Sequence, residues 1–352
     1  MGQLEFTKDK KYHAGADREP TILNANQEYH RYIRRLLAHG FSDKSLREQE
    51  SVLQGCVNTL FQKLHENGEG GKVALNLVQW YSPLRVKYRS LRDINKEKTE
   101  SRIQNGSAVP DFMDKLIETY QSGKISFDQL MGNAEVLLGA GSETTATLLS
   151  GLTYLLTKNP EVREKLIREI RGTFQSPEEI TITAVSQCKY LFACIEEALR
   201  LYPPSPQPHQ RVVPRGGATV AGRFLPEGVV VSIPVYAASR SPRNWARPDE
   251  FVPERWMGED EKGGDLASSS SSSSSLFRGD AREASQPFSY GPRNCLGKNL
   301  AYVEMKIIVA RLVWHFDVEM EDSDEDDWFD QKVYTIWEKK PLWVKLHPVQ
   351  RG

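Results

Sequence analysis

Residues 288–297 read Phe-Ser-Tyr-Gly-Pro-Arg-Asn-Cys-Leu-Gly, and this stretch decides the fold of the chain. Its cysteine, Cys295, stands between two glycines, and a helical pattern follows it. Gly291 and Gly297 allow the backbone to turn tightly and to approach a flat ligand. A helix that begins just after a cysteine directs its N-terminal dipole at the sulfur and favours the thiolate. The stretch therefore predicts a thiolate metal ligand at Cys295; an inert cysteine in a turn is the alternative.

Two neighbours of the cysteine suit the same ligand. Arg293, two residues before it, can donate charge-assisted hydrogen bonds to a carboxylate of the bound group. Phe288 can pack beneath the loop and exclude water. We therefore expect all of these residues to act in one binding loop.

The composition is that of a soluble globular protein. Of the 352 residues, 39% are hydrophobic and 26% are charged, and the net charge of −1 does not indicate a nucleic-acid binder. Four cysteines in a chain of this length do not form a disulfide framework. The N-terminal 30 residues are polar, and no apolar stretch is long enough to span a membrane. We expect neither a signal peptide nor a membrane anchor.

Apolar periodicity and stop signals predict a fold that is mainly α with a small β part. The clearest element is a helix that begins after a Ser126 N-cap and ends before Pro160, apolar on most faces and therefore buried. Further helices are expected at residues 26–66, 88–104, 161–173, 191–201 and 299–316. The pattern GRFLPEG at residues 222–228 predicts a hairpin, and residues 332–339 and 342–348 are β-like.

A carboxylate and a hydroxyl lie side by side in this long helix, where burial is costly without a purpose. Thr144 can open the helix at a bend and hold a water, and Glu143 can relay protons from solvent. The alternative for Thr144 is a hydroxyl that binds a carbonyl of its own helix.

Two further residues, Glu197 and Arg200, lie three apart on one helix face and can pair. With Arg255 they would form a buried charge network, which is more plausibly structural than catalytic.

The cysteine stretch, FxxGxRxCxG, resembles the haem-binding loop of the cytochrome P-450 family. Three more family patterns occur in the family's order: AGSETT at 140–145, EALR at 197–200 and FVPERW at 251–256. The resemblance implies a cytochrome P-450 fold with a long central helix over haem b, whose iron has Cys295 as axial ligand. It also implies that Thr144 and Glu143 take part in oxygen activation. Glu197, Arg200 and Arg255 would form the triad that shapes the core holding the cysteine loop.

The family also uses cations to bind the haem propionates. His30 and Arg34, four apart on the first strong helix, match the family's pattern of an aromatic residue and an arginine, with histidine in place of tryptophan. Arg211 matches the arginine at the edge of the first sheet, and Arg293 completes the set. A solvated helix face is the alternative for His30 and Arg34.

Residues 30–50 and 333–346 look most like fungal members of secondary metabolism, such as trichothecene or benzoate hydroxylases. The resemblance implies a monooxygenase that uses molecular oxygen and NADPH electrons from an NADPH-cytochrome reductase to oxidise a small apolar metabolite. Residues 136–141, 206–209 and 334–336 would line the pocket. Family members usually lie at the cytoplasmic face of the endoplasmic reticulum; without an anchor, a cytoplasmic or peripheral location is expected.

The chain departs from the family in three places. We expect one domain over residues 1–352 with an incomplete N-terminal part, an internal deletion near residues 81–88 and a polyserine insertion at residues 268–275. The deletion removes the helices that roof the substrate pocket in the family. A catalytically inactive, truncated remnant is therefore the alternative to an active enzyme.

Overall fold

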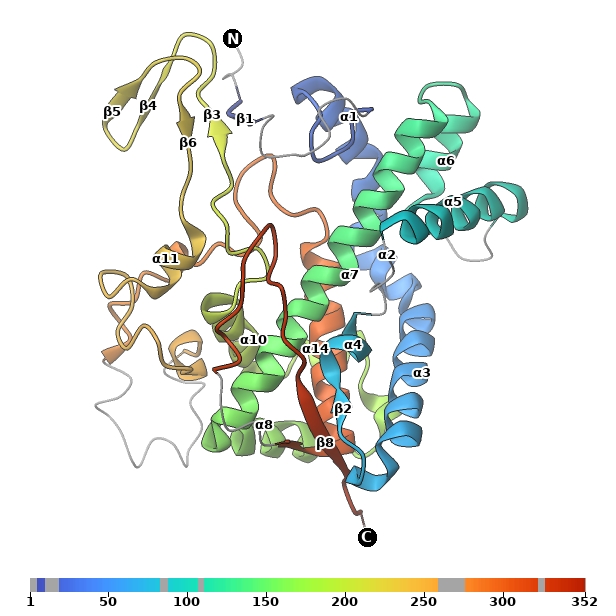
Figure 1. Ribbon diagram of the computed structural model, residues 1–352, viewed down its shortest axis with the longest axis vertical. Helices are drawn as coiled ribbons and strands as arrows, with labels where there is room; N and C mark the ends of the chain where they lie inside the picture. Colours follow the sequence, from blue (N-terminus) through green and yellow to red (C-terminus); the bar gives the residue numbers. More distant parts are fainter. Residues whose placement is uncertain are drawn as a thin grey trace. The chain divides into compact units, whose positions relative to one another are not determined.

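The computed structural model in Figure 1 describes residues 5–9, 19–82, 88–106, 111–258, 276–321 and 327–351. The predicted polyserine insertion at 268–275 and most of the predicted deletion point lie outside these residues. The chain divides into two compact units, which are described separately. The first comprises residues 1–46, 86–141 and 208–234, and the second comprises residues 47–85, 142–207 and 235–352.

The first unit is built on helices and short strands. Its helices are α1 (Gln27–Ala38), η2 (His39–Phe41), α5 (Tyr88–Asn105), α6 (Asp114–Gln121) and the first part of α7 (Phe127–Lys158). Helix α2 (Asp43–Glu48) crosses the boundary between the units. Helix α1 begins where the Asn26 side chain accepts a hydrogen bond from the Tyr29 amide at 2.9 Å, and it buries Ile33 and Leu37 against the core.

Short strands complete the first unit. β1 (Thr7–Lys8), β3 (Arg211–Val212) and β6 (Val230–Val231) form one antiparallel sheet in the order β1-β3-β6. β4 (Ala218–Val220) and β5 (Arg223–Leu225) form a hairpin. Its turn residues are Ala221 and Gly222, both with positive φ, as a two-residue hairpin turn requires. The predicted hairpin is therefore present, but residues 222–228 mostly follow its turn.

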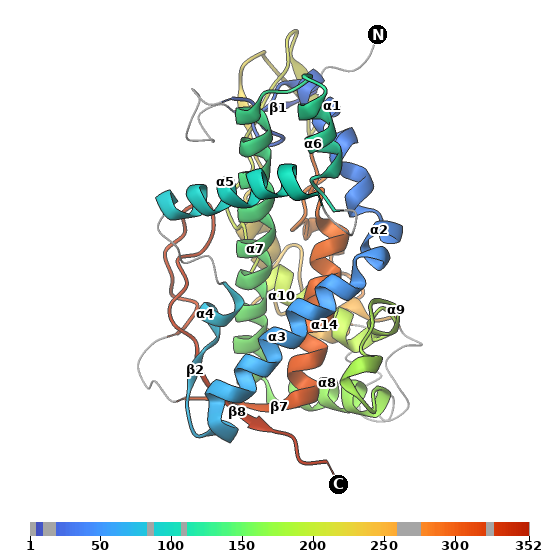
Figure 2. The ribbon, with the colours of Figure 1, turned by 90° about the vertical axis from the view of Figure 1, so that its right-hand side faces the viewer.

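The second unit holds most of the helices. They are α3 (Glu50–Gly68), η3 (Glu69–Gly71), α4 (Leu77–Tyr81), the rest of α7, α8 (Pro160–Thr173), η4 (Pro177–Glu179), α9 (Ile182–Val185), α10 (Lys189–Leu201), α11 (Val235–Arg240), η5 (Pro253–Trp256), η7 (Arg282–Ala284) and α14 (Lys298–His315). Strands β2 (Leu75–Asn76), β8 (Trp343–Pro348) and β7 (Phe316–Met320) form an antiparallel sheet in that order. Helix α14 packs against α3, α8, α9 and α10, and Figure 2 shows α3 crossing it.

Helix α7 has the bounds that the sequence predicts. The Ser126 hydroxyl accepts from the Gln129 amide at 3.1 Å, and the Gln129 side chain accepts from the Ser126 amide at 3.0 Å. These reciprocal bonds satisfy two amides that the helix cannot, and Pro160 begins the next helix. The helix is continuous from residue 127 to residue 158, so the expected opening near Thr144 is not present.

Two predicted elements differ from the structure. The helical region 26–66 is divided at residues 39–42, where Ser42 is extended and its hydroxyl accepts from the Ser45 amide at 3.3 Å to start α2. Residues 332–339 were expected to form a strand but form one isolated bridge, between Val333 and Trp337. The Trp337 ring stacks on Tyr202 at 4.8 Å between centroids, so this segment is held by aromatic packing instead of a ladder.

The predicted fold class, mainly α with small β elements, is confirmed. Among the helices that the structure describes, none combines the length and the apolar character that crossing a membrane would need.

We expect Gly151→Ala to destabilise the protein by about 1–3 kcal/mol, because its new Cβ would lie 2.3 Å from the buried Tyr202 ring. Gly55 is the matched control, since it lies on an exposed face of α3 with open space around it. Gly55→Ala should stabilise α3 by about 0.5–1 kcal/mol. Denaturant unfolding of both variants measures the difference, and equal effects would contradict the packing seen between α7 and Tyr202.

Candidate functional site

The cysteine stretch forms a closed loop in the second unit. The Cys295 amide donates to the Phe288 carbonyl at 2.8 Å, and the Asn294 amide donates to the Gly291 carbonyl at 3.0 Å. Gly291 has φ +80°, a conformation that favours glycine. The Cys295 thiol is not in a disulfide and is exposed to solvent. The loop therefore leaves Cys295 accessible to a ligand.

Helix α14 begins directly after this loop. Gly297 is its N-cap residue, and the Ala301 amide donates to the Gly297 carbonyl at 2.9 Å. Phe288 is half-buried and packs on Tyr302 of the first turns of α14, with ring centroids 5.1 Å apart. Cys295 thus lies at the positive end of an 18-residue helix, where an anionic sulfur is favoured.

The buried side chain of Arg293 supports a ligand with carboxylates. Its Nη1 atom is shielded from solvent and makes no hydrogen bond within the described part of the chain, although other interactions hold this residue. A propionate oxygen of a haem could accept a charge-assisted hydrogen bond from this buried guanidinium. The exposed cysteine, the helix N-terminus and this guanidinium together fit a haem.

A fully buried charge cluster also lies in the second unit. Arg200 donates two hydrogen bonds to the Glu197 carboxylate, at 2.8 and 2.9 Å, and Arg255 donates one at 2.9 Å. The structure thus brings the predicted triad together. Asp280 is a fourth member: it accepts from Arg255 Nη1 and from the Ala246 amide, at 2.7 Å for the latter.

Asp280 balances the charge of the cluster. Glu197, Arg200 and Arg255 alone carry a net charge of +1, and all three have fully buried side chains. Burying an uncompensated charge is strongly unfavourable, and Asp280 makes the cluster neutral. Sequence reasoning missed Asp280, although the unbalanced charge of the predicted triad was a signal that a second carboxylate was needed.

Helix α10 connects this cluster with the cysteine loop. Glu197 faces the cluster, while its neighbour Glu196 accepts a hydrogen bond from the Tyr302 hydroxyl. The Tyr302 ring packs on Phe288, the first residue of the loop. One helix therefore fixes both the charge cluster and the aromatic support of the loop.

The predicted oxygen-activating residues lie on α7 in the second unit. Glu143 is partly exposed, and its carboxylate accepts from the Ser82 hydroxyl and from Lys339 Nζ, at 3.2 Å for the latter. Thr145, next to Thr144, donates to Glu304 Oε2 of α14 at 3.1 Å. Sequence reasoning missed all three partners of these side chains.

Glu304 is a largely buried acid. Desolvation raises its pKa from 4.5 to about 7, although the hydrogen bond from Thr145 opposes this shift. The signal available in the sequence was a carboxylate within the apolar run that follows Cys295.

The remaining predicted propionate ligands belong to the first unit. His30 on α1 is buried, while Arg34, one turn later, and Arg211 on β3 are partly exposed. Burial lowers the pKa of the nearby His209 to about 4, and the charges of Arg211 and Lys8 add to this effect. The structure therefore divides the predicted haem-binding residues between two units.

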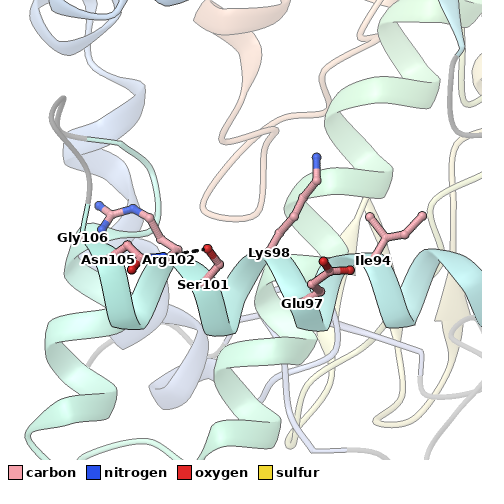
Figure 3. A pocket seen from close by; sticks show the side chains of 7 residues that line it. All are labelled: Ile94, Glu97, Lys98, Ser101, Arg102, Asn105 and Gly106. Atoms are coloured by element: carbon pink, nitrogen blue, oxygen red, sulfur yellow. Dashed lines mark hydrogen bonds between the residues drawn. The ribbon is translucent and has the colours of Figure 1, made fainter.

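A shallow depression also lies along the charged helix α5 (Figure 3). It is lined by residues of this helix and the glycine that follows it: Ile94, Glu97, Lys98, Ser101, Arg102, Asn105 and Gly106. None of these is a predicted site residue, and Figure 3 shows them ranged along a single helix face. We therefore do not assign the functional site to this depression.

Comparison with known proteins assigns the chain to a family, as the cysteine loop suggests. The family model described as cytochrome P-450 matches residues 84–346. The chain belongs to the cytochrome P-450 family, which confirms the predicted family and enzyme class, a cytochrome P-450 monooxygenase.

Its relatives are fungal proteins. Cytochrome P-450 monooxygenase astJ of Aspergillus oryzae is 34% identical over 408 residues, covering 99% of this chain and 79% of the relative. Cytochrome P-450 monooxygenase lcsI of Purpureocillium lilacinum is 37% identical, covering 98% and 76%. Averantin hydroxylase of Dothistroma septosporum is 35% identical, covering 94% and 71%.

We expect Asp280→Asn to destabilise the protein by about 3 kcal/mol, because it leaves the buried Arg255 with too little negative charge. Glu283→Gln, three residues later on an exposed position, is the matched control and should change stability by less than about 0.5 kcal/mol. Chemical denaturation measures both variants. Equal stabilities would show that Asp280 is not part of the charge balance.

The raised pKa of Glu304 predicts a pH dependence of stability. Between pH 4.5 and about 7 the folded protein holds a proton on Glu304 that the unfolded chain releases, so stability is lost as pH rises through 7. Relative to Glu304→Gln, the wild type should lose on the order of 2 kcal/mol of unfolding free energy between pH 5 and pH 8. Parallel pH profiles for the two proteins would contradict this assignment.

Proposed function

We propose that this protein is a haem-thiolate monooxygenase that uses molecular oxygen and reductase-delivered NADPH electrons to hydroxylate a small apolar metabolite in fungal secondary metabolism. The observation that carries the proposal is the cysteine loop: an exposed cysteine directly before the start of a long helix, with the buried side chain of Arg293 two residues away. Hydroxylation is also the reaction named for the averantin hydroxylases among the relatives.

In this proposal the loop residues hold haem b. Cys295 Sγ would bind the haem iron, and the N-terminus of α14 would favour the anionic sulfur. Gly291 and Gly297 would let the backbone approach the haem, Phe288 would exclude water from the loop, and Arg293 would bind a propionate. His30, Arg34 and Arg211 are proposed to bind the propionates as well. The bound haem supplies the activation of molecular oxygen.

The α7 residues handle protons. The Glu143 side chain is 28% exposed, so its carboxylate can exchange protons with solvent. We assign to it the transfer of protons toward Thr144, whose hydroxyl would hold a water in hydrogen-bond reach. Glu197, Arg200 and Arg255 take no part in this transfer and keep the loop in place.

The partners follow from the reaction. An NADPH-cytochrome reductase is proposed to dock near Cys295, and a small apolar substrate is proposed to contact residues 136–141, 206–209 and 334–336. A location in the cytoplasm, or at the cytoplasmic face of the endoplasmic reticulum, would bring the protein and such a reductase together.

The second candidate is a catalytically inactive remnant, and one observation favours it. The alignment with astJ spans 408 positions but holds 99% of this 352-residue chain, so about 60 positions of the relative have no counterpart. We propose that many of these positions belong to the internal deletion near residues 81–88. Without a pocket roof, water would reach the site, and electrons would be used without oxidising the substrate.

The reduced, carbon-monoxide-treated spectrum tests the proposal. The wild type should bind haem and give a thiolate-type Soret band, and Cys295→Ser should lose that band because a hydroxyl does not replace the thiolate. Cys56→Ser, at the other exposed cysteine, should keep it. Turnover with a reductase then separates the two candidates: a thiolate band without product would favour the remnant.

A further inference from the structure

The ammonium group of Lys339 is buried against α7. The Lys339 side chain is 6% exposed, and lysine is rarely buried without partners. Its Nζ lies 3.2 Å from Glu143 Oε2 and 2.8 Å from Thr147 Oγ1. Glu143 and Thr147 are four residues apart, so one ammonium bridges successive turns of the helix.

The other oxygen of the Glu143 carboxylate is also held. It accepts from the hydroxyl of Ser82, a buried residue that directly follows α4. Two elements distant in the sequence, the end of α4 and the segment before β8, therefore fix both oxygens of the same carboxylate. A side chain with both oxygens bound has few rotamers left.

Thr145, the residue that follows Thr144, is also held in place by a hydrogen bond. Four other α7 hydroxyls donate to carbonyls of their own helix: Thr147 to Glu143, Ser150 to Ala146, Thr153 to Leu149 and Thr157 to Tyr154. Thr145 instead donates across to Glu304 of α14. Thr144 thus lies between two residues that are tied to different parts of the second unit.

Lys339 is presented from a rigid support. Two residues earlier, the Trp337 indole N–H donates to the Pro203 carbonyl at 2.8 Å, and its ring stacks on Tyr202. Three residues later, the Leu342 amide donates to the buried Asn76 side chain at 3.1 Å. The chain on both sides of Lys339 is therefore held in place, and its ammonium is held by Glu143 and Thr147.

We propose that Lys339 is a positioning residue for Glu143: its ammonium, with Ser82, holds the carboxylate beside Thr144 and so keeps oxygen consumption coupled to product formation. This inference rests on the proposed monooxygenase function. A purely structural ion pair would affect the stability of the protein but not the amount of product formed per NADPH consumed.

The test uses the full chain with haem and compares Lys339→Met with Lys340→Met. Lys340 is the adjacent lysine, and its Nζ donates to the Asp327 carbonyl at 3.4 Å. Both variants should keep the thiolate-type spectrum. Product formed per NADPH should fall about tenfold in K339M, with a matching rise in hydrogen peroxide, and should stay within about twofold in K340M. Lys339→Arg, which keeps the charge, should recover most of the coupling.

A second readout does not depend on turnover. In a double-mutant cycle, K339M should raise the unfolding equilibrium constant about tenfold, because it leaves Glu143 without its cation. Glu143→Gln combined with K339M should cost less than the two single changes added together. If the wild type yields no product, the monooxygenase proposal fails, while this cycle still tests the contact between Lys339 and Glu143.

Two results would overturn the inference. One is an additive cycle, which would mean that the two side chains do not interact. The other is a K339M protein with wild-type product per NADPH. If K339M does not fold, the E143Q and K339M double variant takes its place; should that variant also fail to fold while K340M folds, Lys339 is a structural residue only.

Discussion

The buried pairing of Glu197 with Arg200 and Arg255 is the interaction on which the second unit depends. Both oxygens of one carboxylate serve two guanidinium groups, the Trp256 indole and the Val252 amide. Removing these charges from water is costly, and only a complete set of partners compensates for it. Because the partners come from α10, η5 and the segment at Asp280, the cluster forms only when these three segments are correctly placed.

The polar side chains of α7, the helix that carries Glu143 and Thr144, also have hydrogen-bond partners. Its buried hydroxyls are satisfied either within the helix or by one side chain from another element. For Glu143 on α7, two other elements supply the partners of its carboxylate. The machinery proposed for proton transfer is therefore held by the tertiary structure, while the helix itself is held by its own caps and apolar faces.

Local signals in the sequence predicted the elements well. Ser126 and Pro160 bounded α7, and the spacing of Glu197 and Arg200 on one helix face predicted their pairing. The family resemblance implied the contact of Arg255 with Glu197, but other contacts between distant residues could not be predicted. Lys339 meets Glu143 across 196 positions, and Glu304 meets Thr145 across 159, so no periodicity links them. The strand expected at residues 332–339 is reduced to one bridge between Val333 and Trp337, and the Trp337 ring stacks on Tyr202.

The ion pair between Arg255 and Asp280 also closes a loop of the chain. The segment between these two residues contains the eight serines, and its ends are fastened to each other on the buried cluster. Loop-closure entropy grows only with the logarithm of length, so doubling such a segment costs about 0.6 kcal/mol. The length of this segment can therefore change at little cost in stability, because the ion pair between Arg255 and Asp280 holds its two ends together.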